Sequence, residues 1–386
     1  MHRIGPGGWT MDILLVEPYN TGSHAEWAQG YARHSGHIVR TLGLSGAHWK
    51  WRMHGGALTL ARKFLESHHT PDFILATDML DVTTFLSLTR SRTAGVPAAV
   101  YFHENQITYP WSPRDRDPGE ERDKHYGFIN FVSALACDRV FFNSHYHMDE
   151  FFSALPGFLA QFPDHQEMGE IDRLREKSAV LPLGFDFSKL QRGTWGGPPG
   201  EKKAENRRPL ILWNHRWEYD KNPDEFFEAL RIVRSRGHDF DIALLGESFE
   251  AIPDSFAQAE DEFGDRIVQF GYVDDRSEYA RWLWKADLLP VTSNQDFFGS
   301  SVIEAVYCGC FPLLPERLSF PELFPAELRS SCFYKDFDDL VRRLVAAIEQ
   351  IDRMRKISFR NVAERYDWQR VAPMYDGCFA DIAAGK

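Results

Sequence analysis

Two basic residues, Arg216 and Lys221, stand between an apolar run of strand length and the start of a helix. We expect that helix to begin with Asn222 as its N-cap, and a cation at this end is unfavourable unless an anion lies between them. Loop amides, the helix dipole and a basic side chain together make a phosphate site. The alternative is an ordinary surface ion pair with Glu218 or Asp220, and the spacing alone favours neither.

A second charged pattern occurs in SNQDFFGSSVIEAVYCGC, residues 293–310, where Asp296 and Glu304 lie eight positions apart. Ser301 and Glu304 have the spacing of a capping box, which taken alone is the simpler interpretation. The functional alternative gives Glu304 to ribose hydroxyls, Asp296 to a sugar and four backbone amides to a diphosphate. Beside Arg216 and Lys221, we expect this helix start to face a diphosphate. The four amides are those of Phe298, Gly299, Ser300 and Ser301.

A polar cluster closes the strand expected at residues 98–104 in the first half of the chain. It consists of His103, Glu104, Asn105 and Gln106, directly after apolar and aromatic residues. Polar groups at such a position need hydrogen-bond partners, which either a substrate or the protein supplies. A single histidine at a strand end is more often structural than functional.

The strand expected at residues 12–17 leads into a helix through a loop that contains Thr21, Gly22 and Ser23. Small and polar residues before a helix start suit contact with an anion or a sugar. The loop does not have the G-x-G-x-x-G pattern, so the sequence does not support a dinucleotide-binding site.

Two segments of the first half mix aromatic with basic side chains. Aromatic faces with interleaved cations suit stacking on unpaired nucleobases. They suit an ordinary helix surface equally well, and the pattern alone favours that interpretation. The residues concerned are Trp49, Lys50, Trp51 and Arg52, followed by Arg122, Lys124, His125 and Tyr126.

We expect no required metal. The D-x-D pairs follow no strand of a nucleotide-binding domain, so we interpret them as solvated or capping acids. The histidine pairs lack a third and fourth ligand at a recognisable spacing. These pairs are Asp115/Asp117, Asp239/Asp241, Asp336/Asp338, His145/His147 and His68/His69.

The composition predicts a globular protein that acts in the cytoplasm, with no membrane contact and no stable protein partner. The chain has 386 residues, and no apolar run approaches the ~20 residues of a membrane span. Five cysteines without a C-x-x-C pair fit reduced thiols. The formal net charge of −12 argues against nucleic-acid binding through a broad basic surface, although not against a local one.

Apolar runs of strand length alternate with helix-period segments along the whole chain, which indicates parallel sheets built from βαβ units. We therefore predict an α/β protein with two Rossmann-like domains, at residues 11–190 and 209–367. Residues 1–10 are a flexible extension, the Gly- and Pro-rich segment 191–208 is a linker, and residues 368–386 form a helix that crosses back to the first domain.

The chain resembles the retaining glycosyltransferases of the GT-B fold, family 4 type, in which two Rossmann-like domains with parallel sheets face a central cleft. More specifically, it is similar to the tRNA-queuosine α-mannosyltransferase family. The matching stretches cover nearly the whole chain beyond residue 11. They include GSH (22–24), WKWR (49–52), YFHENQ (101–106), ERDKHYG (121–127), HRWEYDKNPDEFF (215–227) and FFGSSVIEAVYCGCFPL (297–313).

That resemblance implies metal-independent transfer of mannose from GDP-mannose to the cyclopentenediol of queuosine in a tRNA anticodon, with no cofactor. It implies that Arg216 and Lys221 bind the diphosphate, Glu304 the ribose, and that His103 is the active-site histidine. The family has glutamate where this chain has Asp296, which is one methylene shorter. The implied acceptor-side residues are Gly22, Ser23, His24, Trp49, Lys50, Arg52, Glu104, Asn105, Gln106, Arg122 and Tyr126.

Other functions keep the same fold. A hexosyltransferase that acts on a lipid, a glycan or a small metabolite is the main alternative, and the acidic net charge mildly favours it. A sugar-nucleotide epimerase of this fold would consume the donor without an acceptor. The presence of Arg216, Lys221, His103 and Glu304 argues against a non-catalytic protein that binds a nucleotide or RNA.

Overall fold

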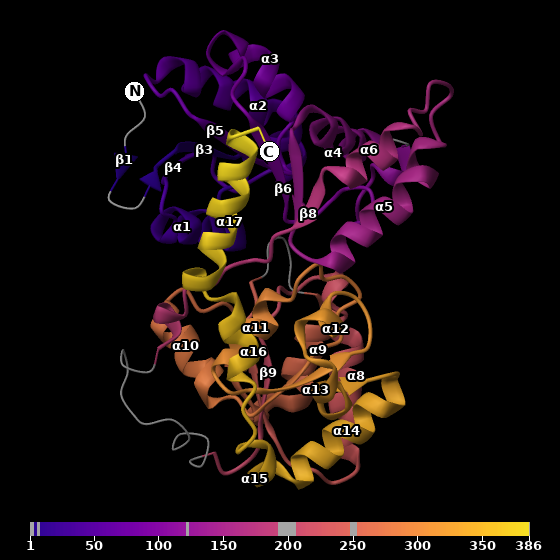
Figure 1. Cartoon of the computed structure of the whole chain (residues 1–386). Coiled ribbons are helices and arrows are strands. Elements are labelled where there is room, and N and C mark those ends of the chain that lie inside the picture. The colour runs from indigo at the N-terminus through magenta and orange to yellow at the C-terminus, as the bar shows by residue number, and fades with distance from the viewer. Residues whose placement is uncertain (1–3, 6–7, 121–122, 192–205, 248–252, 386) are drawn as a thin grey trace. The chain divides into compact units, whose positions relative to one another are not determined.

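The computed structural model describes residues 4–5, 8–120, 123–191, 206–247 and 253–385. The chain forms two compact units, one of Met1–Phe185 with Tyr366–Lys386 and one of Asp186–Arg365 (Figure 1). The boundary between them thus follows Phe185, whereas most of the predicted linker, residues 191–208, lies outside the described residues. No helix of the described part is long and apolar enough to cross a membrane.

The first unit is built on a parallel six-stranded sheet in the order β4-β3-β5-β6-β7-β8. Strands β5 and β6 are buried along their whole length, as expected for strands covered on both faces, while the edge strand β4 is largely exposed. The strands are β3 (Asp12–Glu17), β4 (Ile38–Gly43), β5 (Phe73–Thr77), β6 (Ala98–Phe102), β7 (Arg139–Phe142) and β8 (Ser178–Val180).

Seven helices accompany this sheet in the described part of the first unit. They are α1 (Gly22–His34), α2 (Trp49–Glu66), α3 (Val82–Thr93), α4 (Lys124–Ala136), α5 (His145–Leu159), α6 (Glu170–Glu176) and α17 (Trp368–Ala383), with the short 3-10 helix η1 (Pro118–Glu120). Where the sequence predicts a flexible extension, the short strands β1 (Ile4–Gly5) and β2 (Gly8–Trp9) pair antiparallel; residues 1–3 and 6–7 lie outside the described residues.

Helix α17 belongs to the first unit and packs against α1, which it crosses (Figure 1). The indole of Trp27 donates a hydrogen bond to the Tyr375 hydroxyl at 3.1 Å, and that hydroxyl donates to the Pro182 carbonyl at 3.0 Å. Trp368, at the start of α17, is almost fully buried and lies directly over Gly30. Helix α17 is therefore part of the core of this unit.

The second unit is also built on six parallel strands, in the order β11-β10-β9-β12-β13-β14. The strands are β9 (Leu210–Trp213), β10 (Asp241–Leu244), β11 (Ile267–Phe270), β12 (Leu288–Pro290), β13 (Phe311–Pro315) and β14 (Phe333–Tyr334). The sequence predicts all of these except β14, which has only two residues and so shows no periodicity.

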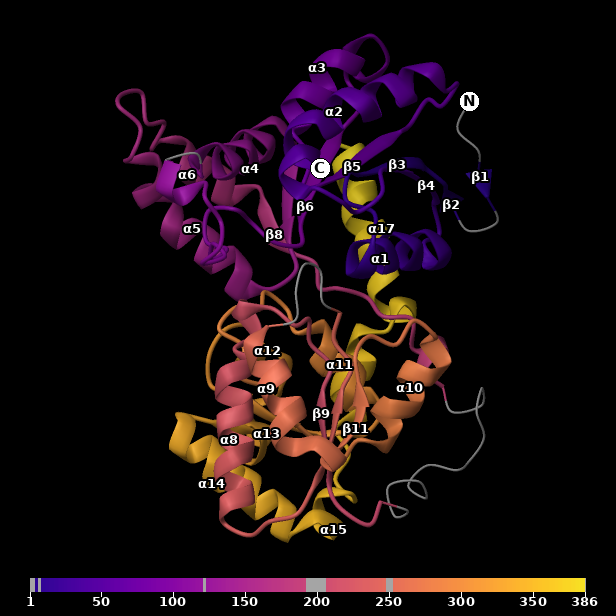
Figure 2. The same ribbon diagram turned by 180° about the vertical axis from the view of Figure 1, so that it is seen from behind.

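The helices of the second unit include a packed set in which α8 contacts α9 and α14 (Figure 2). The helices are α8 (Pro223–Ser235), α9 (Asp254–Phe263), α10 (Arg276–Lys285), α11 (Ser300–Tyr307), α12 (Phe320–Leu323), α13 (Ala326–Cys332), α14 (Phe337–Glu349), α15 (Ile351–Met354) and α16 (Arg360–Ala363). The 3-10 helices are η2 (Phe187–Leu190), η4 (Tyr219–Lys221), η5 (Gly264–Arg266) and η6 (Glu364–Tyr366), which spans the boundary of the units.

Each sheet has one point at which the strand order reverses direction along the chain. It lies between β3 and β5 in the first unit and between β9 and β12 in the second. In open parallel sheets, ligands bind beyond the carboxyl ends of the strands at such a switch point. The loops that follow β3, β5, β9 and β12 are therefore where each unit is expected to hold a ligand.

Replacing Gly30 by alanine should destabilise the first unit. The new Cβ would lie 2.0 Å from Nε1 of Trp368, so the indole of a fully buried residue would have to move. We expect the free energy of unfolding to fall by roughly 1–3 kcal/mol, as for other overpacked cores. Urea denaturation of the full chain measures this change.

Gly377→Ala is the matched control, because Gly377 lies in α17 and a methyl group added there would meet no atom within 4 Å. Alanine is the better helix former and should raise stability there by about 0.5–1 kcal/mol. Equal effects of the two substitutions would contradict the proposed packing of Trp368 on Gly30.

Candidate active site

Lys221 is a buried cation at the switch point of the second unit. It ends η4 in the loop after β9, and its Nζ donates to the Gln295 carbonyl at 2.6 Å and to Asp296 Oδ2 at 3.2 Å. Asp220 Oδ2 lies 3.3 Å away. Burial acts to lower the pKa of Lys221, but Asp296 and Asp220 together raise it above its ordinary value. The ammonium group therefore stays charged and fixes the loops after β9 and β12 to each other.

Arg216 lies in the same loop with its side chain 44% exposed, and its guanidinium is 3.6 Å from Asp220 Oδ2. The ion pair that the sequence offered as the alternative is thus present. That distance is long for a hydrogen bond, and the exposed group can still reach an anion. The sequence predicts Asn222 as the N-cap of α8, and it does take that position, but in a left-handed conformation and without a capping hydrogen bond from its side chain.

Asp296 shapes the turn before α11. Its Oδ1 accepts hydrogen bonds from the amides of Phe298 at 3.2 Å and Gly299 at 2.6 Å, while Oδ2 accepts from Lys221. Gly299 has φ +93°, and an added Cβ would lie 3.0 Å from the Phe320 ring, so glycine suits this position on both counts. Two of the four amides predicted to face a diphosphate are therefore bonded to Asp296. Its predicted contact with a sugar stays a prediction.

The capping box that the spacing of Ser301 and Glu304 offered as the simpler alternative does not form. Helix α11 begins at Ser300 with Gly299 as its N-cap, so Ser301 already lies inside the first turn. The Ser301 hydroxyl is instead hydrogen-bonded to Nδ1 of His215 at 2.8 Å. The reason is the left-handed Gly299, which starts the helix before the serine can act as a cap.

Glu304 is held by side chains of α10. Its carboxylate forms an ion pair with Arg276 and accepts a hydrogen bond from the Tyr279 hydroxyl at 2.9 Å. Asn214, directly after β9, donates to the Ser301 carbonyl at 2.9 Å and to the Tyr279 hydroxyl at 3.3 Å. The carboxylate is thus fixed beside the start of α11, where the sequence places a ribose contact.

His215 is a site residue that the sequence analysis did not select. It is only 3% exposed, and its Nε2 is buried with no hydrogen-bond partner among the described residues. Burial, and then the nearby charge of Lys221, lower its pKa to about 4, so the ring is neutral at pH 7. The position of His215 between a buried strand and Arg216 was the sequence signal that could have identified it. The roles of Arg276 and Tyr279 depend on contacts between distant segments, which the spacing of residues does not reveal.

Replacing Lys221 by methionine should leave Asp296 and the buried Asp220 without the lysine cation, and only the more distant Arg216 would remain near Asp220. Breaking a buried ion pair in this way costs roughly 3–5 kcal/mol. We expect urea denaturation to show a loss of that order. Lys356→Met, an exposed lysine of the same unit, should change stability by less than about 0.5 kcal/mol. Similar values for both variants would contradict the role of Lys221.

The switch point of the first unit brings together Glu17, His24, Asp78 and His103. Glu17 Oε2 lies 3.1 Å from Nδ1 of His24, and both residues are buried. Burial acts to lower the pKa of His24, but Glu17, Asp78 and Glu104 raise it to about 9. His24 is therefore a buried imidazolium paired with a carboxylate at neutral pH.

His103 is fixed through both its backbone and its ring. Its amide donates to Asp78 Oδ1 at 2.8 Å, and its carbonyl accepts from Asn143 Nδ2 at 2.9 Å. The ring centroid lies 4.2 Å from that of His24 and 4.6 Å from that of Trp27. Burial, and then the charge of His24, hold the pKa of His103 well below its usual range. The pair thus combines one charged and one neutral imidazole, and Nε2 of His103 has no partner among the described residues.

The rest of the polar cluster after β6 is mostly structural. Asn105 is fully buried, and its Oδ1 accepts from the amides of Ile107 at 3.1 Å and Thr108 at 2.9 Å. Gln106 Nε2 donates to Glu104 Oε1 at 2.9 Å. Asn105 therefore forms the turn, while Glu104 and Gln106 are half-buried at its edge.

Helix α1 begins at Gly22, which has φ +50°, with Thr21 as an N-cap that makes no side-chain bond. Gly22 and Ser23 are exposed at this helix start, and His24 is buried behind them. An exposed first turn with unused amides is a suitable contact for an anion or a hydroxyl.

The predicted aromatic and basic residues divide into different environments. Tyr126 is buried, and its ring lies 5.1 Å from that of the half-buried Trp49. Lys50 is paired with Asp115 at 2.7 Å and Asp117 at 2.5 Å, so these acids are not simply solvated as the sequence predicted. The Arg52 guanidinium donates to the Ser45 carbonyl at 3.1 Å. Arg122 lies outside the described residues.

One group of three side chains in the described ranges could hold a metal ion. The carboxylate of Glu17 and the rings of His24 and His103 each offer an atom within 4.8 Å of the others. The raised pKa of His24 favours a proton on its ring over a metal ion, because Glu17 already binds the protonated ring. The expectation that the protein requires no metal stays a prediction.

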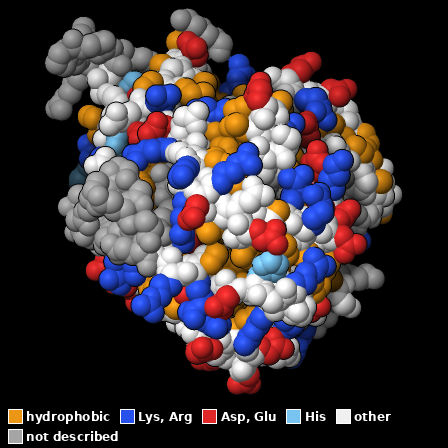
Figure 3. All heavy atoms as spheres, turned by 90° about the horizontal axis from the view of Figure 1, so that it is seen from below, with side chains coloured by type: hydrophobic (Ala, Val, Ile, Leu, Met, Phe, Trp, Pro, Cys, Tyr) orange, Lys and Arg blue, Asp and Glu red, His pale blue; other side chains and the backbone are white. Residues whose placement is uncertain are grey.

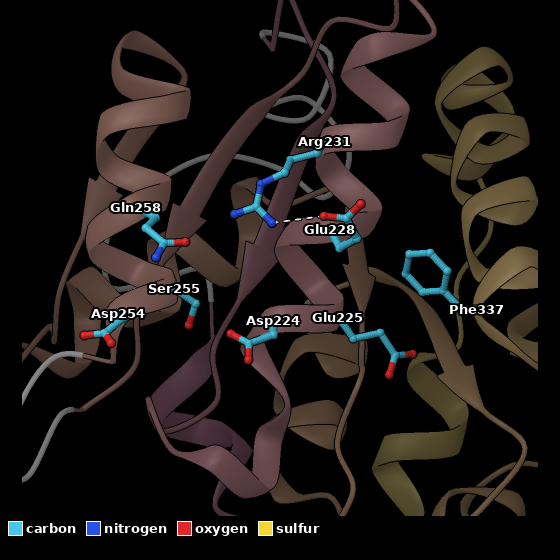
Figure 4. A pocket seen from close by; sticks show the side chains of 8 residues that line it. All are labelled: Asp224, Glu225, Glu228, Arg231, Asp254, Ser255, Gln258 and Phe337. Carbon is cyan, nitrogen blue, oxygen red and sulfur yellow. Dashed lines mark hydrogen bonds and ion pairs between the residues drawn. The ribbon is translucent and has the colours of Figure 1, made fainter.

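A surface hollow of about 650 Å³ lies beside α8 and α9 of the second unit. Figure 4 shows four acidic side chains around it, with Arg231 paired to Glu228. Such a lining would repel a diphosphate, and none of the predicted site residues lines the hollow. The acids are Asp224, Glu225, Glu228 and Asp254.

The buried pair of His24 and Glu17 should make stability depend on pH. The unfolded histidine titrates near 6.5 and the folded one near 9, so the folded state binds more protons between these values. Stability from this pair is complete below pH 6.5 and is lost as the pH rises towards 9, by on the order of 3 kcal/mol.

Urea denaturation at pH 6.5 and pH 9 measures this loss, and His24→Gln should show a much smaller difference between the two conditions. The same pH dependence in both proteins would contradict the assignment of the charge to His24.

Comparison with known proteins places these two sites in context. Two family models match the chain: tRNA-queuosine alpha-mannosyltransferase N-terminal over residues 12–185, and Glycosyl transferases group 1 over residues 199–358. A curated tRNA-queuosine alpha-mannosyltransferase of Drosophila melanogaster is 32% identical over 318 residues, which are 82% of this chain and 82% of that protein.

Solved structures of low sequence identity share the fold. Anabaena HepE in complex with UDP-glucose superposes with a TM-score of 0.66 at 15% identity, over 97% of this chain and all of that one. The catalytic domain of starch synthase IV from Arabidopsis thaliana, bound to ADP and acarbose, gives 0.73 at 12% identity, over 97% and 100%. The prediction of a GT-B architecture with two parallel-sheet domains is thereby confirmed.

Proposed function

The chain belongs to the tRNA-queuosine alpha-mannosyltransferase family, and from this premise we propose that it transfers mannose from GDP-mannose to the cyclopentenediol of queuosine in a tRNA anticodon. The observation that carries the proposal is the buried Lys221 beside the exposed Arg216, at the switch point between β9 and β12. Two cations at that position suit the diphosphate of a nucleotide-sugar.

The second unit supplies the donor contacts in this proposal. Lys221 and Arg216 neutralise the diphosphate, and the first amides of α11 point to the same anion. Glu304, fixed by Arg276 and Tyr279, accepts hydrogen bonds from the ribose hydroxyls. The ring of His215 stays neutral and sets the orientation of the Ser301 hydroxyl at this helix start.

The transfer step proceeds on the face from which the diphosphate leaves. The bond between the anomeric carbon and the phosphate oxygen breaks, and an acceptor hydroxyl oxygen forms the new bond to that carbon. The leaving phosphate oxygen takes the hydroxyl proton. Because the new bond forms on the face from which the diphosphate leaves, the configuration of the anomeric carbon is retained. Arg216 and Lys221 stabilise the negative charge as it develops. Asp296 is engaged with Lys221 and two backbone amides, which makes it a poor candidate for a covalent nucleophile.

The first unit supplies the acceptor contacts. Neutral His103, held by Asp78 and Asn143, orients the transferred sugar, while the exposed start of α1 and the edge residues Glu104 and Gln106 meet the acceptor. We place the reaction in the cytoplasm. All five cysteines lie in the described part of the chain and are thiols without a disulfide, which suits a reducing compartment.

The direct test is to incubate the purified protein with GDP-mannose and queuosine-containing tRNA, digest the RNA and weigh its nucleosides. Queuosine should gain one hexose. UDP- and ADP-sugars in parallel reactions test the donor, and a chelator tests the independence from metal. Transfer to a lipid, glycan or small metabolite, with queuosine unchanged, would overturn the proposal and leave the fold intact.

Arg216→Ala should lower the turnover number by on the order of 10²-fold or more, because the guanidinium meets charge that develops during transfer. The same nucleoside assay measures the rate at saturating substrates. Arg231→Ala is the matched control, since Arg231 lies on α8 of the same unit, paired with Glu228 and Glu262. Full activity of Arg216→Ala would show that the donor site is assigned wrongly.

A further inference from the structure

A protein of negative net charge that acts on RNA is expected to bind the RNA through a few local contacts. On the face drawn in Figure 3, basic and acidic side chains of the described residues are interspersed, and the formal net charge is −12. A net charge of this sign disfavours binding through phosphate contacts over a broad basic surface. Proteins that recognise single-stranded RNA also use aromatic side chains on which unpaired bases stack.

Trp51, in the first turn of α2, is the most exposed of the large hydrophobic side chains in the described ranges, at 62%. The neighbouring Trp49 is different, because its ring packs against Trp111 and Tyr126 at 6.0 and 5.1 Å. The sequence predicts Trp49 and Tyr126 as acceptor contacts. The structure gives both a packing role and presents Trp51 to solvent instead.

Gly55 explains how the indole of Trp51 is held. It lies one turn later in α2, and a Cβ added there would be 2.5 Å from Cε2 and Cζ2 of Trp51. The indole thus lies across the helix backbone at Gly55, which no other residue would permit. Glycine inside a helix is unfavourable relative to alanine. At this position the glycine leaves the room that the large exposed ring of Trp51 occupies.

Arg52 is the basic side chain of α2 that suits an anionic partner beside Trp51. Its guanidinium donates to the Ser45 carbonyl, whereas Lys50 is paired with two aspartates and the remaining cations lie near the other end of the helix. The helix itself has no acid in its first turn, where the helix dipole is positive. A flat ring held at this helix start beside Arg52 matches a nucleotide, which has a π face and a phosphate.

We propose that Trp51, supported by Gly55, is a stacking platform for an unpaired nucleobase of the RNA acceptor. This inference rests on the proposed function, because it takes the acceptor to be tRNA. Stacking recognises the face of a base rather than its edge, so the platform positions the RNA and leaves the identity of the modified nucleoside to other residues.

Affinity for RNA tests the platform independently of catalysis. The probe is a fluorescently labelled anticodon stem-loop, titrated with the full chain and followed by anisotropy. Trp51→Ala should weaken binding roughly 5- to 100-fold, the range given by losing one stacked base, and Trp51→Phe should restore most of it. Leu58→Ala is the matched control, because Leu58 is 55% exposed on the same helix and should bind normally.

Gly55→Ala separates the platform from general damage to the protein. The methyl group displaces the exposed indole, while alanine favours the helix, so RNA binding should weaken without a fall in the melting temperature. In the transfer assay, the KM for tRNA should rise in Trp51→Ala, whereas the KM for the donor and the turnover number at saturating tRNA should stay unchanged.

The outcomes separate this inference from the proposed function. If the wild-type chain transfers hexose to queuosine and Trp51→Ala binds the stem-loop as tightly as wild type, the platform is wrong and the function stands. If the wild-type chain transfers nothing to queuosine, the function fails, and the anisotropy titration still decides whether Trp51 binds RNA. Loss of self-association in Trp51→Ala with unchanged RNA binding would also overturn the platform.

Discussion

The buried ion pair of Lys221 with Asp296 and Asp220 is the interaction on which the second unit depends. A lysine that is 8% exposed can stay charged only with carboxylates beside it, and these two come from the loops after β9 and β12. One interaction therefore joins the two loops at the switch point, keeps the ammonium group charged at the proposed donor site, and places Asp296 so that its other oxygen shapes the turn at Gly299.

The first unit also contains a buried ion pair, in which a protonated histidine supplies the positive charge instead of a lysine. Glu17 and His24 form the buried pair, and the charge on His24 helps to keep the adjacent His103 neutral. Trp27 contacts the ring of His103 and is itself bonded to Tyr375 of α17. Tyr375, in helix α17, thus supports the Trp27 ring that packs against His103.

Much of the fold follows from the sequence, because buried parallel strands are continuous apolar runs and the helices between them have a regular period. The loops after the strands could be identified for the same reason; Lys221 and Asp296 lie in them, and Glu304 lies in the helix that follows the second of these loops. The capping box failed because Gly299 sets the helix start through its conformation, which a spacing rule ignores. The partners of Glu304 and the exposure of Trp51 rather than Trp49 depend on packing between distant segments, and no local pattern contains that information.

The first unit is discontinuous in sequence, and this affects the order in which the protein can be made. Residues 186–365 are an uninterrupted segment that is translated between the two parts of the first unit. The first unit, although its translation begins earlier, lacks Trp368 over Gly30 and the hydrogen bond of Trp27 to Tyr375 until α17 has been made. Completion of the first core therefore waits for a helix that is translated after the whole second unit.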